Sequence, residues 1–207
     1  MVAIEHGITT FDEGTGTVCI SWGAVAQVVD ESRCDGFSRL NRNHGLGGRE
    51  GEIVLELNPT FAPEAVARFR QKVREGFFRG MSFYRVIEGF VAQAGPGDDI
   101  PLDEDDLLPA EFELSRGEDL PWVTVQRNDL FAPETGFIDG FAAARDDRQV
   151  WLTHCPGAVA VARGNEPDSG ARDFYIVIGQ APRYLDRNLT VFARVIDGME
   201  TVQRIQR

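Results

Sequence analysis

The sequence has few cysteines, and their spacing excludes the common structural uses of this residue. Cys19, Cys34 and Cys155 are odd in number and form no Cys-x-x-Cys pair, so neither a zinc ribbon nor a disulfide framework is indicated. Free thiols are typical of a reducing compartment. We therefore expect a cytoplasmic protein; if an export signal upstream of Met1 is missing from this sequence, a bacterial periplasm is the alternative.

Long hydrophobic runs and an excess of positive charge are also absent. No run approaches the roughly 18 apolar residues that indicate a membrane span. The formal net charge is −12, from 21 basic and 33 acidic residues, which argues against a nucleic-acid partner and against an anionic membrane surface. The apolar stretch 18–29 lacks the positive start of a signal peptide, because no Lys or Arg precedes Arg33.

The chain contains enough hydrophobic residues, 43% of 207, to form a core, and its length favours one domain. Residues 1–50 are rich in glycine and read as an extension with room for one strand, at Thr17–Val29. Residues 52–57 alternate apolar and polar side chains, which predicts a strand. Pro63–Gly76 then predicts a helix with proline in its first turn and glycine at its C-terminal end.

Two polar groups invite a metal or nucleophile interpretation that we do not favour. The acidic residues between Asp98 and Asp106 could bind a hard cation, but their spacing matches no calcium loop, so we expect a solvated loop. His154 and Cys155 are neighbours on a predicted strand and would point to opposite faces. We expect both to pack in the core, and no cofactor or metal.

The most informative stretch is Phe83–Gly95, an apolar run that contains Arg85. Aromatic and β-branched residues predict strand here, and Glu88-Gly89 reads as a tight turn within it. An arginine beside buried strands is costly unless it is used. Lying over a sheet edge with its head in water is the simplest alternative role for Arg85.

Four stretches together resemble the cyclophilins, a family of peptidyl-prolyl cis–trans isomerases. They are Phe83–Gly95, Gly157–Ser169, Phe174–Ile176 and Thr190–Met199, in the family's order. The resemblance implies a mainly β fold, an antiparallel β-barrel of about eight strands capped by two helices, over residues 51–207. Residues 118–150 exceed the family's usual length, and we interpret them as an inserted loop or hairpin, in which Val123–Val125 is a candidate strand. A closing strand is hard to find, so either Thr17–Val29 supplies one or the barrel seam is partly open.

The resemblance also implies a function and a set of site residues. It implies an isomerase that acts on X-Pro bonds in unfolded or flexible chains, as a monomer, by a non-covalent mechanism. Arg85 is the implied catalytic donor. Residues implied to bind the substrate are Phe90, Val91, Gln93, Ala162, Arg163, Asp173, Tyr175, Tyr184, Leu185 and Leu189.

Four of these positions depart from the family pattern. Asp173 replaces a usual glutamine, Tyr175 a phenylalanine, Tyr184 a tryptophan and Leu189 a histidine. The carboxylate of Asp173 would orient or partly neutralise Arg85, and Tyr175 would bring a hydroxyl to an apolar slot. The alternative function is therefore a weakly active or inactive module that binds proline peptides.

Overall fold

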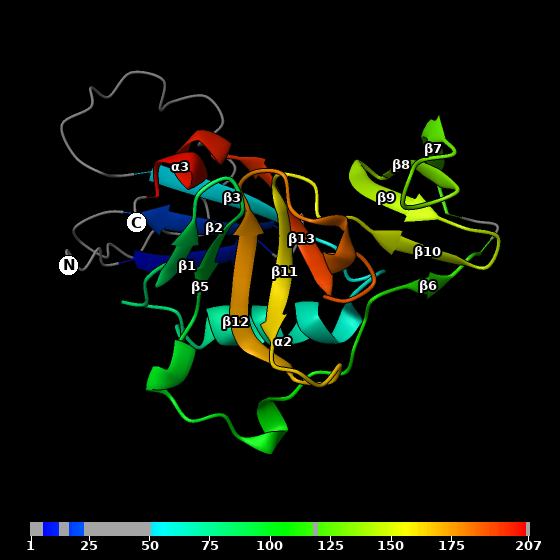
Figure 1. The fold of residues 1–207 in the computed structure, drawn as a ribbon. Helices are drawn as coiled ribbons and strands as arrows, with labels where there is room; N and C mark the ends of the chain where they lie inside the picture. The colour runs from blue at the N-terminus through cyan, green and yellow to red at the C-terminus, as the bar shows by residue number, and fades with distance from the viewer. Residues whose placement is uncertain (1–5, 13–16, 23–50, 118–119, 206–207) are drawn as a thin grey trace.

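The computed structural model describes residues 6–12, 17–22, 51–117 and 120–205, which form two antiparallel β-sheets and two α-helices (Figure 1). The larger sheet has eight strands. In spatial order they are β1 (His6–Asp12), β2 (Thr17–Trp22), β3 (Gly51–Leu57), β13 (Val191–Asp197), β11 (Ala158–Arg163), β12 (Gly170–Val177), β5 (Val91–Ala94) and β4 (Arg85–Ile87). Among the described residues, no helix is long and apolar enough to cross a bilayer.

The two N-terminal strands extend one edge of the larger sheet, beside β3, where the sequence analysis looked for a closing strand of the barrel. The predicted strand at Thr17–Val29 is found as β2, which pairs with β3; residues 23–29 lie outside the described part of the chain. β1 was not predicted and forms a hairpin with β2. β1 and β4 lie at the two edges of the sheet, which agrees with an incomplete barrel seam.

The strand and helix that follow confirm the pattern in the sequence. In β3 the alternate residues Ile53, Leu55 and Leu57 are buried. Helix α2 (Pro63–Arg74) begins at its proline and buries Ala65, Val66, Phe69 and Val73. Gly76 follows with φ +69°, a left-handed conformation that favours glycine. The second helix, α3 (Met199–Arg204), packs against β3.

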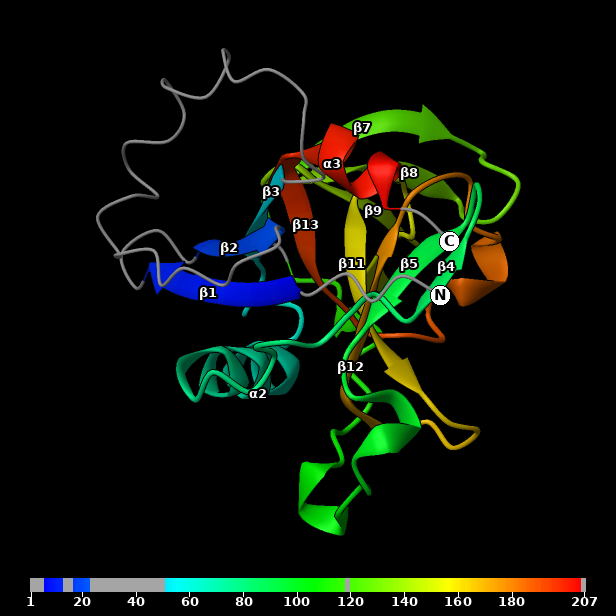
Figure 2. The same ribbon diagram turned by 90° about the vertical axis from the view of Figure 1, so that its left-hand side faces the viewer.

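The main core lies between α2 and one face of the larger sheet. Phe69 of α2 packs against the rings of Phe78, Phe174 and Phe192, with centroids 5.0–5.5 Å from its own. Figure 1 shows α2 crossing behind β11 and β12, and Figure 2 shows it on one side of the larger sheet. Aromatic pairs at this distance add to the stabilisation from burial, so the helix is held firmly and the opposite face of the sheet is left for other contacts.

The insertion forms a second sheet, which corrects the prediction of a loop or single hairpin. Its order is β6 (Leu114–Ser115), β10 (Gln149–Leu152), β9 (Phe141–Arg145), β8 (Glu134–Ile138) and β7 (Trp122–Arg127). Only the centre of β7 was anticipated. β8 and β9 are rich in glycine and alanine, which are weak strand formers, and their side chains are small enough for the core that they help to form.

The two sheets share a second core. This cluster joins the second-sheet residues Ile138, Phe141, Ala143, Val150 and Leu152 to the face of the larger sheet that is turned away from α2. Alternate residues of β12 divide between the cores: Phe174 and Ile176 face α2, whereas Tyr175 and Val177 face the insertion. The insertion is therefore packed onto the sheet face that carries the predicted site.

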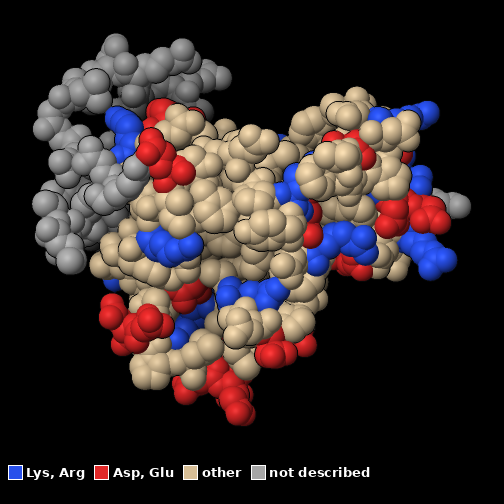
Figure 3. Space-filling view, viewed as in Figure 1, with Lys and Arg blue, Asp and Glu red and all other residues tan. Residues whose placement is uncertain are grey.

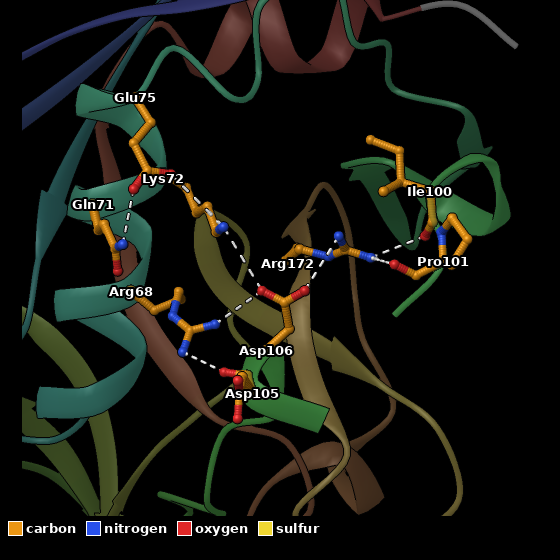
Figure 4. Close-up of polar contacts among 9 residues, drawn as sticks. All are labelled: Arg68, Gln71, Lys72, Glu75, Ile100, Pro101, Asp105, Asp106 and Arg172. Carbon is orange, nitrogen blue, oxygen red and sulfur yellow. Dashed lines mark hydrogen bonds and ion pairs between the residues drawn. The ribbon is translucent and has the colours of Figure 1, made fainter. Parts of the chain in front are cut away.

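The acidic segment is only partly solvated, which corrects the expectation of a free loop. It contains two short 3₁₀ helices, η2 (Gly97–Asp99) and η3 (Glu104–Asp106), and acidic side chains gather over this end of the molecule (Figure 3). Asp106, however, faces Arg68 and Lys72 of α2 and Arg172 of β12, at 3.1, 3.7 and 3.3 Å (Figure 4). The segment is thus tied to the fold by this carboxylate and by the backbone oxygens of Ile100, Pro101 and Asp105, which accept hydrogen bonds from Arg172 and Arg68.

Candidate active site

Strand pairing places the central predicted residues in one row across the larger sheet. Arg85 of β4 pairs with Gln93 of β5, Gln93 with Tyr175 of β12, and Tyr175 with Ala160 of β11. Residues directly opposite each other in antiparallel strands project on the same face. The row therefore runs from a cation, through an amide, to an aromatic ring and a small residue.

Arg85 is exposed but not free to rotate without cost. Its Nη1 donates a hydrogen bond to Oε1 of Gln93 at 3.1 Å. The turn at Glu88-Gly89, with Gly89 at φ +65°, lets β5 run back beside β4 in this register. The guanidinium has no other hydrogen-bond partner among the described residues, so most of its five N–H groups are available to a ligand.

Most of the predicted apolar residues gather in the second core, beside this row. Val91, Tyr175 and Leu185 are buried in it, and Phe90, Ala162 and Leu189 pack against it while remaining partly exposed. Leu185 comes from the short helix η4 (Arg183–Leu185), which follows β12. Segments distant in the chain thus form one apolar cluster, which includes Tyr175 and Ala160 of the row.

The hydroxyl of Tyr175 is directed into the protein. It lies 2.8 Å from Nε2 of His154, and Nδ1 of His154 lies 3.0 Å from Oδ1 of Asp186. An ionised carboxylate only accepts hydrogen bonds, so Nδ1 of His154 carries a proton and donates it to Asp186, while Nε2 faces the hydroxyl of Tyr175. The polar group that Tyr175 adds is therefore satisfied by His154.

Asp186 anchors this chain of hydrogen bonds and connects it to the insertion. Burial raises the pKa of Asp186, but hydrogen bonds from the His154 ring and backbone and from Arg183 outweigh burial and hold the pKa below its usual value. Arg183 also lies 3.3 Å from Asp129, in the turn between β7 and β8, and its guanidinium lies over the ring of Phe131. The tip of the insertion is thus joined to the helix that carries Leu185.

Asp173 does not contact Arg85 directly. Its Oδ1 accepts hydrogen bonds from the Tyr84 hydroxyl at 3.0 Å and from the backbone N–H of Gly97 at 2.9 Å. The Tyr84 hydroxyl in turn accepts from Nε2 of Gln93 at 2.5 Å. Asp173 was expected to orient the guanidinium of Arg85 or to neutralise it. It is connected to Arg85 only indirectly, through the side chains of Tyr84 and Gln93.

Two predicted residues lie apart from the row. The guanidinium of Arg163 donates to the backbone oxygens of Asn188, Gly164 and Asn165 and holds these loops together. Tyr184 of η4 is 71% exposed. The resemblance implies that Arg163 binds the residues before proline through its backbone and that Tyr184 helps to close the proline pocket. Both roles stay predictions.

Sequence reasoning gave no site role to Tyr84, Asp186 or His154, and it placed Cys155 in the core. Tyr84 was only the aromatic residue of the arginine motif, and Asp186 was not considered. His154 is buried as expected, but both its ring nitrogens are hydrogen-bonded, whereas Cys155 is exposed and not in the core. The strand ends at Leu152, so alternation did not apply to this pair. Among the described residues, no group of three His, Cys, Asp or Glu side chains is arranged to hold a metal ion.

Comparison with known proteins identifies the family. Residues 44–207 match the family model described as cyclophilin type peptidyl-prolyl cis-trans isomerase/CLD. A probable peptidyl-prolyl cis-trans isomerase of Brucella suis is 30% identical over 163 residues, which cover 77% of this chain and 68% of that protein. Peptidyl-prolyl cis-trans isomerase CYP23 of Arabidopsis thaliana is 25% identical over 191 residues, which cover 92% of this chain and 70% of that protein. The chain belongs to the cyclophilin-type peptidyl-prolyl cis–trans isomerase family.

Solved structures support the same fold. The cyclophilin AquaCyp293 from Hirschia baltica matches with a TM-score of 0.65 and 29% identity over 74% of this chain, and this chain spans 63% of that one. A Cryptosporidium parvum cyclophilin-type isomerase, crystallised in the presence of the dipeptide Ala-Pro, matches with a TM-score of 0.51 and 17% identity. The match covers 74% of this chain and 80% of that one. The second likeness concerns the fold alone.

Proposed function

We propose that this chain accelerates rotation about X-Pro bonds in unfolded or flexible polypeptide segments, and that it does so without forming a covalent intermediate. One observation carries the proposal. The pairing of β4, β5, β12 and β11 puts Arg85, Gln93, Tyr175 and Ala160 in a row, and its last two members belong to an apolar cluster. Membership of the cyclophilin-type family supports the same reaction.

The reaction needs no nucleophile or redox group. Rotation of the amide is slow because resonance is lost at the twisted geometry, and the barrier is about 18–20 kcal/mol. A 10⁵-fold acceleration, taken as an order of magnitude, corresponds to about 7 kcal/mol of preferential binding to the twisted amide. The twisted amide has a lone pair on nitrogen, and a fixed cation with several N–H donors stabilises it.

The residues of the site would divide this work between them. Arg85 would donate to the twisted amide, and Gln93 would hold Arg85 in place. Phe90, Val91, Tyr175, Leu185 and Leu189 would receive the proline ring, while the chain before proline rotates. Ala162 lies at a register shift in the pairing of β11 with β12, where backbone groups leave the regular ladder and are suited to bind an extended peptide.

The alternative function, a weakly active or inactive module that binds proline peptides, rested on Asp173 and Tyr175. The contacts of these two residues weaken the argument for it. The carboxylate of Asp173 is engaged by Tyr84 and Gly97, so it does not form an ion pair with Arg85. The hydroxyl of Tyr175 is engaged by His154, so it is paired inside the protein and adds no unpaired polar group to the apolar cluster. Neither change gives a reason to expect an inactive protein.

A protease-coupled assay on a short Ala-Pro peptide tests the proposal. Arg85→Ala is expected to lower kcat/KM by about 100-fold or more, the usual effect of removing a transition-state donor. Arg148→Ala is the matched control, because Arg148 is exposed in the turn between β9 and β10, outside the site, and the control should keep wild-type activity. Equal rates for wild type and Arg85→Ala would remove the catalytic role of this arginine.

A further inference from the structure

The hydrogen bond between Gln93 and Arg85 depends on which way the amide of Gln93 faces. Arg85 can only donate, so the oxygen of Gln93 must point toward it. An amide has nearly the same shape after a 180° flip, and the flipped group would present its NH₂ to a cation. Some neighbouring group must therefore fix the amide if Arg85 is to be held.

Tyr84 and Asp173 supply such a neighbour. A carboxylate only accepts, so the Tyr84 proton goes to Asp173, and the lone pairs of the phenol oxygen face the NH₂ of Gln93. The direction of donation is then the same at each link from Arg85 to Asp173. Burial and the nearby Asp173 charge both raise the pKa of Tyr84, which keeps its proton in place.

The backbone of Gly95 and Gly97 lies in close contact with the side chain of Asp173. A Cβ at Gly95 would lie 2.6 Å from Oδ1 of Asp173, and Gly95 has φ +130°, so only glycine fits without strain. Gly97 donates its N–H to the same oxygen. The preceding residue on β12, Arg172, is fixed by Asp106 and by the backbone oxygens of Ile100 and Pro101 (Figure 4). Asp173 is thus held on both sides.

We propose that Tyr84 and Asp173 are positioning residues that set the orientation of Gln93 and, through it, of Arg85. This inference rests on the proposed function, in which Arg85 acts on the twisted amide. In this inference Asp173, which differs from the family's usual glutamine, helps to build the site. Asp173 and Tyr84 act as one unit, and the loss of either residue would leave the amide of Gln93 free to flip.

The kinetic test uses Tyr84→Phe and Asp173→Ala in the full chain, with the Ala-Pro peptide. Each is expected to lower kcat by about 10-fold, the effect of losing one charge-assisted hydrogen bond, and to leave KM nearly unchanged. The double variant should be no slower than the slower single variant. In the Arg85→Ala background, Tyr84→Phe should have no further effect. Asp98→Asn, an exposed carboxylate on η2, is the control for lost charge.

A spectroscopic readout separates this inference from the proposed function. In the ¹H–¹⁵N NMR spectrum, Tyr84→Phe should shift the side-chain amide signals of Gln93 and the Nε–H signal of Arg85, and Asp98→Asn should shift neither. Unchanged signals, or wild-type kcat in Tyr84→Phe, would overturn the positioning role. If Arg85→Ala is fully active while these signals do shift, the positioning is upheld and the proposed role of Arg85 fails.

Discussion

At the scale of single residues, a tyrosine stands where the family usually has a phenylalanine, and its hydroxyl is accommodated by two residues outside the apolar surface. His154 hydrogen-bonds the hydroxyl of Tyr175, and Asp186 holds His154, so the polar end is paired inside the protein while the ring packs in the second core. A buried hydroxyl without a partner would be destabilising, which makes the three residues a single unit.

Tyr175→Phe tests this interpretation. The change leaves Nε2 of buried His154 without its partner, and we expect the free energy of unfolding to fall by about 1–3 kcal/mol. Activity should stay within about threefold of wild type, a difference under 1 kcal/mol, because the ring is retained. Denaturant unfolding and the peptide assay measure the two quantities. A large loss of activity at unchanged stability would show that the hydroxyl acts on the substrate.

Asp186 predicts how stability depends on pH. Its pKa in the folded protein is held below the usual value by His154 and Arg183 despite burial, so it stabilises the fold above its unfolded pKa of about 4. That contribution is lost as the pH falls through the lower, folded pKa. Asp186→Asn should therefore be less stable than wild type at pH 7, and the difference should narrow below about pH 4. A difference that is independent of pH would contradict the assignment.

At the scale of elements, the insertion is part of the site's foundation. Its strands β8, β9 and β10 contribute to the same core as Tyr175 and Val91, and its tip is joined to η4 through Asp129 and Arg183. Within the insertion, Glu134 of β8 binds Arg145, Trp122 and Thr124, and the hydrogen bonds from Arg145 and Thr124 lower its pKa to about 2. The second sheet is thus internally connected as well as packed onto the first.

Phe141→Ala tests whether the two sheets form one cooperative unit. Phe141 is 5% exposed in the shared core, so its truncation should lower the free energy of unfolding by about 3–5 kcal/mol. Fluorescence and circular dichroism should still report one coincident transition. Val125→Ala, 64% exposed on β7, is the control and should change stability by less than about 0.5 kcal/mol. Two separate transitions for the wild type would contradict a shared core.

At the scale of the whole molecule, the sequence predicted the elements whose pattern is local. The alternation in β3, the proline start of α2 and the turn at Glu88-Gly89 were all readable, and so was the motif that contains Arg85. β1 and most of the second sheet were missed although their strands pair with neighbours in the chain. In the second sheet the strand signal is weak, because β9 has three alanines among its five residues and alanine has a low preference for strands. The connection between Tyr84 and Asp173 was missed because the two residues are 89 positions apart, and no spacing rule could connect them.

Charge distribution gives a prediction for the whole chain. The acidic segment is a poor cation site because its most buried carboxylate, Asp106, with a side chain only 13% exposed, is already surrounded by Arg68, Lys72 and Arg172. Millimolar calcium should therefore leave the melting temperature unchanged relative to an ionic-strength control, whereas Asp106→Ala should lower it. A rise in melting temperature specific to calcium would show that these carboxylates bind the ion.

The most direct test of the account is the exchange rate between cis and trans Ala-Pro peptide, measured by NMR exchange spectroscopy with catalytic amounts of protein. The account predicts accelerated exchange with wild type, nearly none with Arg85→Ala, and wild-type exchange with Arg148→Ala. Exchange as fast with Arg85→Ala as with wild type would contradict it.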